Sequence, residues 1–441
     1  MLKIFFNFLF VLAIFFEIAG CRYDHKAEIN TFQIPATEDI IMYEINIGAF
    51  STTHNLQGIT DRLDAVKALG INTIWLMPVY PVGIINSFGS PYCVRDYKNI
   101  NTDYGTIEDL QHLVVEAHDR DIAVILDWVA NHTAWDNAWI NNEGWYTEDG
   151  AGNIISPPGT TWTDVADLNY DNADMRLAMI DAMQFWITTA DIDGFRCDAA
   201  DYVPFDFWQQ AIDSLHNIRP DLILLAEGSR YDHFTAGFQM NFGWSFLTTM
   251  KNVFNGLTSA NAIYASNTGE YSAVPDGGEK LRFITNHDET NIAVPSEVFG
   301  SNEAALAAAV ITYCLNGVPL IYSGQEVGVT NNSVYSGFGF INWASNPDIL
   351  FNYQQLLNFY SQSEVLKKGD LESFADVSFV VFKKTFQGER VVVIVNTKST
   401  TQTLNVPAAI QGTWNNVFDQ TIINLDATLE LGADQFLILK N

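Results

Sequence analysis

Short apolar runs alternate with helical patterns along the chain up to residue 361. Between the runs, apolar residues recur with the period of a helix, as in TIEDLQHLVVEAHDRD and DRLDAVKALG. Alternating strands and helices are typical of a parallel sheet whose strands are joined by crossover helices. The apolar runs, which are rich in β-branched residues, span residues 40–47, 71–77, 122–127, 193–198, 222–227, 281–286 and 317–322.

Acidic residues stand at or just after the ends of four runs, and their spacing favours one fold. Asp127, Asp198, Glu227 and Asp288 are separated by 71, 29 and 61 residues. A (β/α)8 barrel of about 250 residues uses about 30 residues for each unit. The spacing therefore corresponds to strands three, four, five and seven, with an insertion after strand three. A doubly wound sheet also fits the alternation, but eight units favour an α/β TIM (β/α)8 barrel.

Two segments depart from this alternation. Residues 132–174 contain many turn residues and little helical periodicity, which predicts a small inserted lobe over the barrel mouth. Short strands separated by turns then predict a C-terminal all-β sandwich domain over residues 362–441, after a catalytic barrel over residues 39–361. We expect four tryptophans to form the core of the lobe, the alternative being aromatic platforms for sugars; they are Trp135, Trp139, Trp145 and Trp162.

The N-terminal segment has the pattern of an export signal. Lys3 precedes a long apolar run that ends in Ile18-Ala19-Gly20-Cys21. This ending resembles a bacterial lipoprotein signal over residues 1–20, which implies cleavage before Cys21 and acylation of its sulfur. Residues 21–38 would then be a linker. We expect an exported, membrane-anchored lipoprotein on the periplasmic or cell-surface side; the alternative is an uncleaved anchor helix.

Charge and cysteine content exclude several kinds of partner. The chain has 22 Lys and Arg against 52 Asp and Glu, a formal net charge of −30. Such a surface repels phosphate backbones, which argues against nucleic acid, whereas a neutral sugar is not repelled. Cys93, Cys197 and Cys314 are scattered and odd in number, so we expect core residues rather than disulfides or metal ligands. No motif indicates an organic cofactor.

The carboxylates at the strand ends have three plausible uses: metal binding, glycoside chemistry and closure of the barrel. The C-terminal ends of barrel strands form the active site, so these side chains should converge. Metal hydrolases usually show paired histidines, whereas His132 and His287 are single and lie on different strands. A retaining glycosidase needs a nucleophile and an acid about 5–5.5 Å apart. Asp198 and Glu227, one barrel unit apart, are placed for these two tasks.

Arg196 stands two residues before Asp198, in the stretch DGFRCD. Residues two apart on a strand face the same way, so the guanidinium should lie beside the carboxylate and favour its ionised form. A nucleophile must be ionised while the partner acid keeps its proton. The alternative is a purely structural Arg–Asp pair at the barrel rim.

Four motifs together resemble the α-amylase family of glycoside hydrolases, over most of residues 39–441. They are DWVANH at 127–132, GFRCD at 194–198, Glu227 in LLAEG, and NHD at 286–288. The resemblance implies that Asp198 is the nucleophile, Glu227 the general acid and base, and Asp288 a stabiliser of the transition state. It further implies that the substrate and the nucleophile are held by His132, His287 and Arg196, and that Tyr92 stacks under the sugar.

The chain departs from the family pattern at Asp201-Tyr202, where many α-amylases carry Lys-His at an acceptor subsite. The variable segment 165–169 does not choose among amylases, oligosaccharide-splitting enzymes and cyclodextrinases. In the family, residues at the positions of Asn131 and Asp167 often bind a structural Ca²⁺, and such oxygen ligands suit calcium. Asn131 could instead hydrogen-bond the lobe.

The leading hypothesis is an anchored, retaining hydrolase of α-1,4-glucosidic bonds in starch, maltodextrin or a related α-glucan. A second hypothesis is a cyclodextrinase, neopullulanase-like or transglycosylating enzyme of the same family. A third, from another class, is a non-catalytic glucan-binding lipoprotein. That last class would lack one of Asp198, Glu227 and Asp288, and all three are present.

Overall fold

The structure is a computed structural model that describes residues 32–335 and 339–441. The predicted signal segment and Cys21 lie outside the described residues. No helix within the described part of the chain combines the length and hydrophobicity that crossing a bilayer requires.

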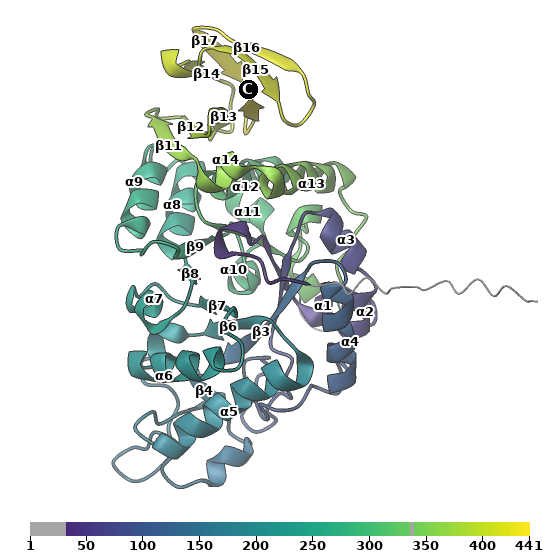
Figure 1. The fold of residues 1–441 in the computed structure, drawn as a ribbon, viewed down its shortest axis with the longest axis vertical. Coiled ribbons are helices and arrows are strands. Elements are labelled where there is room, and N and C mark those ends of the chain that lie inside the picture. The colour runs from purple at the N-terminus through teal and green to yellow at the C-terminus, as the bar shows by residue number, and fades with distance from the viewer. Residues whose placement is uncertain (1–31, 336–338) are drawn as a thin grey trace, which may run out of the picture. The chain divides into compact units, whose positions relative to one another are not determined.

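Eight parallel strands close into a barrel, which confirms the predicted fold (Figure 1). One strand was missed by the sequence pattern: β8 has only three residues, too few to form a recognisable apolar run. In ring order the strands are β1 (Met42–Ile45), β2 (Thr73–Leu76), β3 (Ala123–Val129), β6 (Gly194–Asp198), β7 (Ile223–Ala226), β8 (Met240–Phe242), β9 (Glu279–Arg282) and β10 (Val318–Tyr322).

The barrel strands are buried on both faces, which explains why the sequence shows continuous apolar runs instead of alternation. Alternate residues form two cores. Trp75, Ile125 and Leu225 belong to a core inside the barrel, whereas Ile74 and Leu126 pack outward against the helices. The local sequence also sets helix ends: Thr106 and Asp109 form a capping box at the start of α4.

The helices follow the strands in the order expected for βα units. They are α1 (Ile47–Phe50), α2 (Leu56–Thr60), α3 (Leu63–Ala68), α4 (Ile107–His118), α5 (Ala173–Ala190), α6 (Phe205–His216), α7 (Asp232–Ala236), α8 (Trp244–Phe254), α9 (Ala262–Tyr271), α10 (His287–Ile292), α11 (Pro295–Phe299), α12 (Asn302–Leu315), α13 (Pro347–Gln362) and α14 (Glu364–Lys368).

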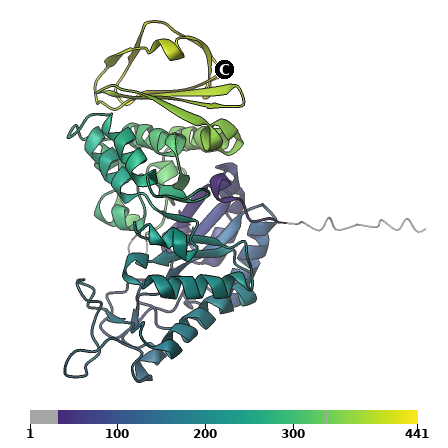
Figure 2. The ribbon, with the colours of Figure 1, turned by 60° about the vertical axis from the view of Figure 1, so that its left-hand side comes forward.

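The insertion after β3 is held by a short antiparallel pair. Strands β4 (His132–Ala134) and β5 (Val165–Asp167) pair so that His132 lies opposite Asp167. Most of the chain between them is irregular, with one turn of helix at Ala138–Asn141. Figure 2 shows these loops at the end of the barrel away from the C-terminal strands.

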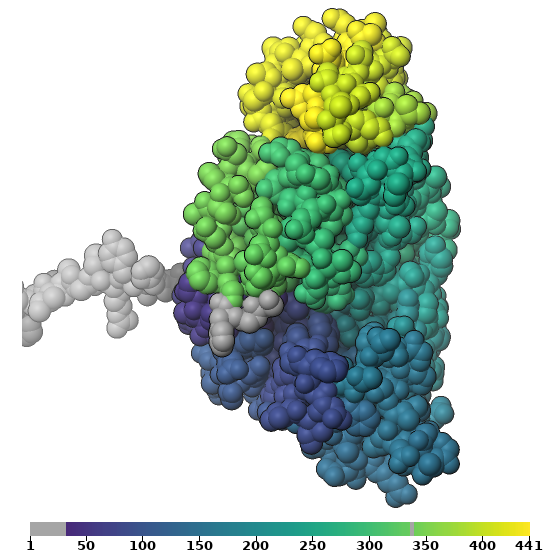
Figure 3. All heavy atoms as spheres, turned by 180° about the vertical axis from the view of Figure 1, so that it is seen from behind, coloured from purple at the N-terminus to yellow at the C-terminus, as the bar shows by residue number. Residues whose placement is uncertain are grey.

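The C-terminal domain is all-β, as predicted. Its larger sheet packs one face on the barrel helices α12 and α14 and the other on a second core shared with a two-stranded sheet. Figure 3 shows these strands, in yellow, seated directly on the green helical segment. The larger sheet has the order β11 (Asp370–Phe374), β12 (Phe379–Phe386), β13 (Glu389–Asn396), β18 (Phe436–Lys440), β15 (Gly412–Asn416) and β16 (Ile422–Leu425); the smaller joins β14 (Gln402–Asn405) to β17 (Thr428–Leu431).

Cys93, Cys197 and Cys314 are buried and unpaired with one another, as the sequence predicted.

Candidate active site

A cavity of about 390 Å³ opens at the C-terminal ends of the barrel strands. A second cleft of about 560 Å³ continues from it and shares Ser90, Tyr92, His287 and Asp288. The first cavity is lined by six of the predicted site residues, namely Tyr92, His132, Asp198, Glu227, His287 and Asp288. The structure therefore brings them together, although they are spread over almost 200 residues of sequence.

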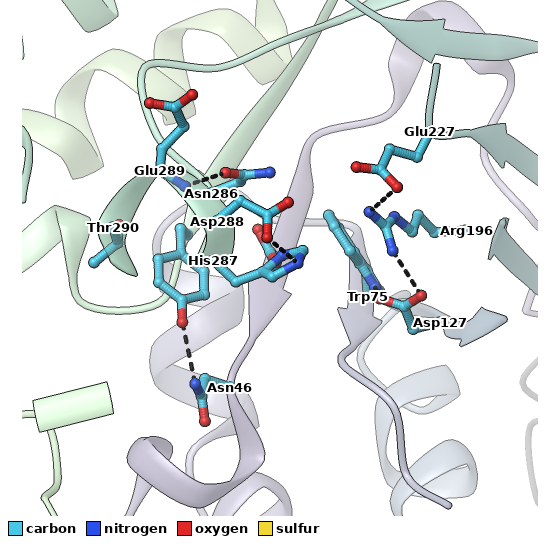
Figure 4. Close-up of polar contacts among 12 residues, drawn as sticks. Asn46, Trp75, Asp127, Arg196, Glu227, Asn286, His287, Asp288, Glu289 and Thr290 are labelled. Atoms are coloured by element: carbon cyan, nitrogen blue, oxygen red, sulfur yellow. Dashed lines mark hydrogen bonds and ion pairs between the residues drawn. The ribbon is translucent and has the colours of Figure 1, made fainter. Parts of the chain in front are cut away.

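Arg196 lies beneath the cavity floor and contacts three carboxylates. Its Nη1 donates hydrogen bonds to Asp127 Oδ1 at 2.8 Å and to Asp198 Oδ1 at 2.9 Å. Its Nη2 lies 3.0 Å from Glu227 Oε2 as an ion pair. Figure 4 shows the guanidinium between Glu227 and Asp127, beside the Trp75 ring. The side chain is completely buried, so these three carboxylates are its charge partners.

Asp127 supports the site from below and does not line the cavity. It accepts hydrogen bonds from Trp75 Nε1 at 3.0 Å and Tyr92 Oη at 2.9 Å, in addition to the one from Arg196. Trp75 also lies under the guanidinium, whose Cζ is 4.8 Å from the ring centroid. Asp127 thus fixes the buried Arg196 and also Tyr92, which lines the cavity.

His287 is held in its charged form. Its Nδ1 lies 2.6 Å from Glu44 Oε1, and its Nε2 lies 2.8 Å from Tyr92 Oη and 3.3 Å from Asp288 Oδ1. Burial lowers the pKa of His287, but Glu44 and Asp288 outweigh burial and raise the pKa to about 9. A protonated ring donates from both nitrogens, so a proton chain runs from His287 through Tyr92 to Asp127.

His132 is neutral by contrast. Burial lowers its pKa to about 4, and its Nε2 lies 3.2 Å from the carbonyl oxygen of Tyr92. Its ring also stands edge-on to Trp162, with centroids 5.5 Å apart. The carbonyl can only accept, so Nε2 carries the ring hydrogen and Nδ1 accepts from Asn131 Nδ2 at 3.2 Å; the neutral ring adds no charge to this wall of the cavity.

Asp288 enters the site from a helix, not directly from a strand end. Strand β9 stops at Arg282, earlier than the predicted run, and Asp288 lies in the first turn of α10. Asn286 caps that helix by accepting from the backbone N–H of Glu289 at 2.9 Å, as Figure 4 shows. The Asp288 side chain is 53% exposed, so its carboxylate borders the open cavity.

Asp198 and Glu227 differ in how they are held. Burial raises the pKa of Asp198, Arg196 lowers it, and the carboxylates of Glu227, Asp127 and Asp288 raise it again. The net effect raises the pKa of Asp198 well above its ordinary value. Arg196 hydrogen-bonds Asp198 and forms an ion pair with Glu227, so one guanidinium is shared by the two carboxyl groups.

The backbone next to Asp198 orients Glu227. Ala199 has a left-handed conformation with φ of 46°, which is uncommon outside glycine and marks local strain. In this conformation its N–H donates to Glu227 Oε2 at 2.7 Å. Because Oε2 is engaged as an acceptor, Oε1 is the Glu227 oxygen that would carry the proton in the acid form of this side chain.

The family profile "Alpha amylase, catalytic domain" matches residues 44–150 and 160–376. The chain belongs to the α-amylase family. Alpha-amylase 3 of Dictyoglomus thermophilum is 26% identical over 86% of this chain and 88% of that protein. Alpha-amylase MalA of Haloarcula japonica is 29% identical over 87% of this chain and 59% of that protein. The solved α-amylase of Lactobacillus plantarum has a TM-score of 0.82 at 24% identity, covering 92% of this chain and 99% of that one. Family membership makes this chain a glycosidase.

Sequence reasoning missed four residues of this α-amylase-family site: Glu44, Trp75, Trp162 and Tyr202. Glu44 had a visible signal, a carboxylate inside the buried run 40–47. Trp135, Trp139 and Trp145 pack on the main core, and Trp162 packs on a small buried cluster that includes Ala134 and Val165 of the lobe strands. It lines the cavity, and its ring centroid lies 5.5 Å from that of Tyr202, which is 56% exposed.

The predicted calcium ligands lie at the same end of the β4–β5 pair: Asn131 directly precedes β4, and Asp167 is the last residue of β5, opposite His132. Asn131 is buried, and its Nδ2 lies 3.2 Å from His132 Nδ1. Burial raises the pKa of the Asp167 carboxyl. Within the described residues, no group of three or more His, Cys, Asp or Glu side chains is arranged to hold a metal ion. The pair matches calcium in its oxygen chemistry but supplies two of the six to eight ligands that calcium takes.

Proposed function

We propose that this member of the α-amylase family is a retaining hydrolase of α-1,4-glucosidic bonds in starch, maltodextrin or related α-glucans. The single observation that carries the proposal is the contact of one buried guanidinium with both Asp198 and Glu227 at the floor of an open cavity. It holds two carboxyl groups next to one another, which supports the pair that retention requires, one acting as nucleophile and the other as acid.

In the first step, Asp198 attacks the anomeric carbon while Glu227 transfers its proton to the departing glycosidic oxygen. A covalent glycosyl-aspartate forms as the glycosidic bond breaks. In the second step, the Glu227 carboxylate takes a proton from water, and the resulting hydroxide equivalent displaces Asp198. Two inversions leave the anomeric configuration unchanged.

The surrounding residues act where charge develops on the sugar ring. Asp288, exposed at the cavity edge, would bind ring hydroxyls more strongly as positive charge grows. The cationic His287 and the neutral His132, which both contact Tyr92 and line the cavity, would border the space for the sugar hydroxyls. The tyrosine itself would offer an aromatic face to the sugar.

The substrate axis follows from the position of the acid. Glu227 must face the glycosidic oxygen, so the cavity wall beside it, with Tyr202 and Trp162, would take the leaving part of the chain. The second cleft, which has Tyr92 and Asp288 but not Glu227, would take units on the other side. Space on both sides suits an oligosaccharide or polysaccharide.

The test is incubation of the full-length protein, purified in mild detergent, with soluble starch, maltoheptaose and β-cyclodextrin. NMR identifies the anomer first released, and Asp198→Asn is the matched control. We expect prompt α-anomer from starch, absent in the variant. Faster cleavage of cyclodextrin than of starch would assign the alternative, a cyclodextrinase-like enzyme. No turnover of any α-glucan by folded protein would contradict the mechanism and the substrate class.

We also propose membrane attachment through an acylated Cys21, supported by the sequence pattern alone. Growth with labelled palmitate should label the wild-type protein and not Cys21→Ser. Label in both proteins, or in neither, would contradict the proposal.

We further propose that Asn131 and Asp167 contribute to a structural calcium site. Added calcium should then raise the melting temperature, and Asp167→Asn should abolish that rise. A wild-type protein whose melting temperature is the same in chelator and in calcium would contradict it. No catalytic step depends on this ion.

A further inference from the structure

The turn that follows Glu227 is tied down by Asp201. The Asp201 carboxylate accepts the backbone N–H of Ser229 on Oδ2 at 3.1 Å and that of Arg230 on Oδ1 at 3.2 Å. Both donors lie within three residues of Glu227. Asp201, in the loop after β6, therefore fixes the backbone just after β7, where the proposed acid Glu227 lies.

Other bonds join the same two loops. Ala200 N–H donates to the carbonyl oxygen of Glu227 at 2.9 Å, and Glu227 N–H donates to the carbonyl oxygen of Cys197 at 2.9 Å. Arg230 returns the contact, since its Nη1 donates to the carbonyl oxygens of Asp201 and Val203 at 2.9 and 3.1 Å. The loops after the nucleophile and after the acid thus form one hydrogen-bonded unit.

Gly228 permits the close approach on which this unit depends. A Cβ on Gly228 would lie 2.4 Å from Asp201 Oδ1, so the carboxylate would have to move away from its present position. The residue type at 201 matters equally. The lysine that many relatives carry at this position has three donors and no acceptor, so it could not bind these two N–H groups. The arrangement is therefore a property of this chain and not of the lysine-bearing pattern.

We infer that Asp201 is a positioning residue that holds Glu227 at the departing oxygen. The inference rests on the proposed function and deepens it. Without the two N–H bonds, the turn at 228–230 loses its fixed geometry, and the Glu227 carboxyl loses alignment with the oxygen it must protonate. A misplacement of about 1 Å can cost about 100-fold in rate. The loss should grow with the need of the leaving group for a proton.

The experiment compares two substrates of the same length, phenyl and 2,4-dinitrophenyl α-maltotrioside. Phenol leaves slowly without a proton, whereas dinitrophenol leaves without help. In Asp201→Ala, kcat/KM for the phenyl substrate should fall about 10- to 100-fold. For the dinitrophenyl substrate kcat/KM should fall less than about 3-fold, because this leaving group does not need a proton from the acid. In Asp201→Asn, which keeps one acceptor oxygen, kcat/KM for the phenyl substrate should lie between those of Asp201→Ala and the wild type.

Two controls make the pattern specific. Glu227→Gln should show the same selectivity more strongly, because it removes the acid itself. Asp193→Ala removes another carboxylate that accepts from a backbone N–H, that of Val124 at 2.7 Å, just before β6 and at the end of this strand opposite Asp198. That variant should change kcat/KM for the two substrates by the same factor.

Equal losses on both aryl substrates in Asp201→Ala and Asp201→Asn, or no loss on either, would overturn the inference. Inactivity of the wild type on both substrates would instead overturn the proposed function. Circular dichroism spectra of each variant establish that the comparison is made on folded protein.

Discussion

Arg196 and Asp198 face the same way on strand β6, and Arg196 Nη1 donates a hydrogen bond of 2.9 Å to Asp198 Oδ1. The two-residue spacing in the sequence is thus explained by the pleat of the strand. The same guanidinium reaches Asp127 on β3 and Glu227 just after β7, so it neutralises part of a buried cluster of carboxylates. One side chain links three neighbouring strands of the barrel.

Replacing this arginine by lysine should disable catalysis. An ammonium is a point charge and cannot contact three carboxylates with the geometry of a planar guanidinium. We expect kcat/KM of Arg196→Lys on maltoheptaose to fall at least about 100-fold, comparable to removing one preorganised donor. Arg219→Lys is the matched control, since Arg219 pairs with Asp191 and Asp193 away from the cavity. Near-normal activity of Arg196→Lys would contradict the assigned role.

The charge on His287 should make stability depend on pH. Its pKa of about 9 lies above the ordinary value of 6.5, so the folded state binds this proton more tightly. The resulting stability is fully present below about pH 6.5 and is lost as the pH rises through about 9. The melting temperature should therefore decline across this window, and the NMR signal of His287 should titrate near its upper end.

Glu44→Gln tests the cause of that shift, because Glu44 is the strongest influence that raises the pKa of His287. In this variant, the His287 titration should move to lower pH and the decline of the melting temperature should shrink. An unchanged titration of His287 would show that Glu44 does not set its charge.

The sequence predicted the barrel and the convergence of the carboxylates because both follow from local spacing. Parallel strands end at the same rim, so Asp127, Asp198 and Glu227 had to meet once their strands were placed. Glu227 follows directly on the last residue of β7, and Asp198 is the last residue of β6. The prediction was less exact for Asp288, because the strand before it stops six residues earlier.

The parts that could not be predicted depend on contacts between distant segments. Glu44 meets His287 across 243 residues of sequence, and nothing near either residue indicates the other. Trp162 packs on the buried cluster of the lobe and also lines the cavity, and the pattern of residues 132–174 does not indicate that second contact. The proton partners of the site therefore needed the three-dimensional structure.

The Tyr202–Trp162 pair should govern binding of the leaving part of the substrate. Tyr202 is 56% exposed at the cavity wall that Glu227 shares. Tyr202→Ala should lower kcat/KM on maltoheptaose about 5- to 10-fold, because it removes an aromatic contact that contributes about 1 kcal/mol. It should also reduce transglycosylation products relative to hydrolysis, whereas Tyr202→Phe should retain both. Product ratios measured by chromatography check this, and an equal effect of both substitutions would assign the role to the hydroxyl instead of the ring.

Lys384 should stabilise the docking of the C-terminal domain without affecting catalysis. It lies on β12, is 1% exposed, and donates to the carbonyl oxygen of Leu315 at the end of α12 at 2.9 Å and to that of Leu366 in α14. Lys384→Met keeps the apolar stem but leaves two buried carbonyls without a donor, which costs about 1–3 kcal/mol per group. We expect a lower melting temperature with kcat and KM on maltoheptaose unchanged. Lys383→Met, on the neighbouring residue with a half-exposed partner, Glu372, should leave the melting temperature almost unaltered. A loss of kcat in Lys384→Met would mean that the β-domain acts on the barrel mouth, and equal melting temperatures for both variants would contradict the docking role.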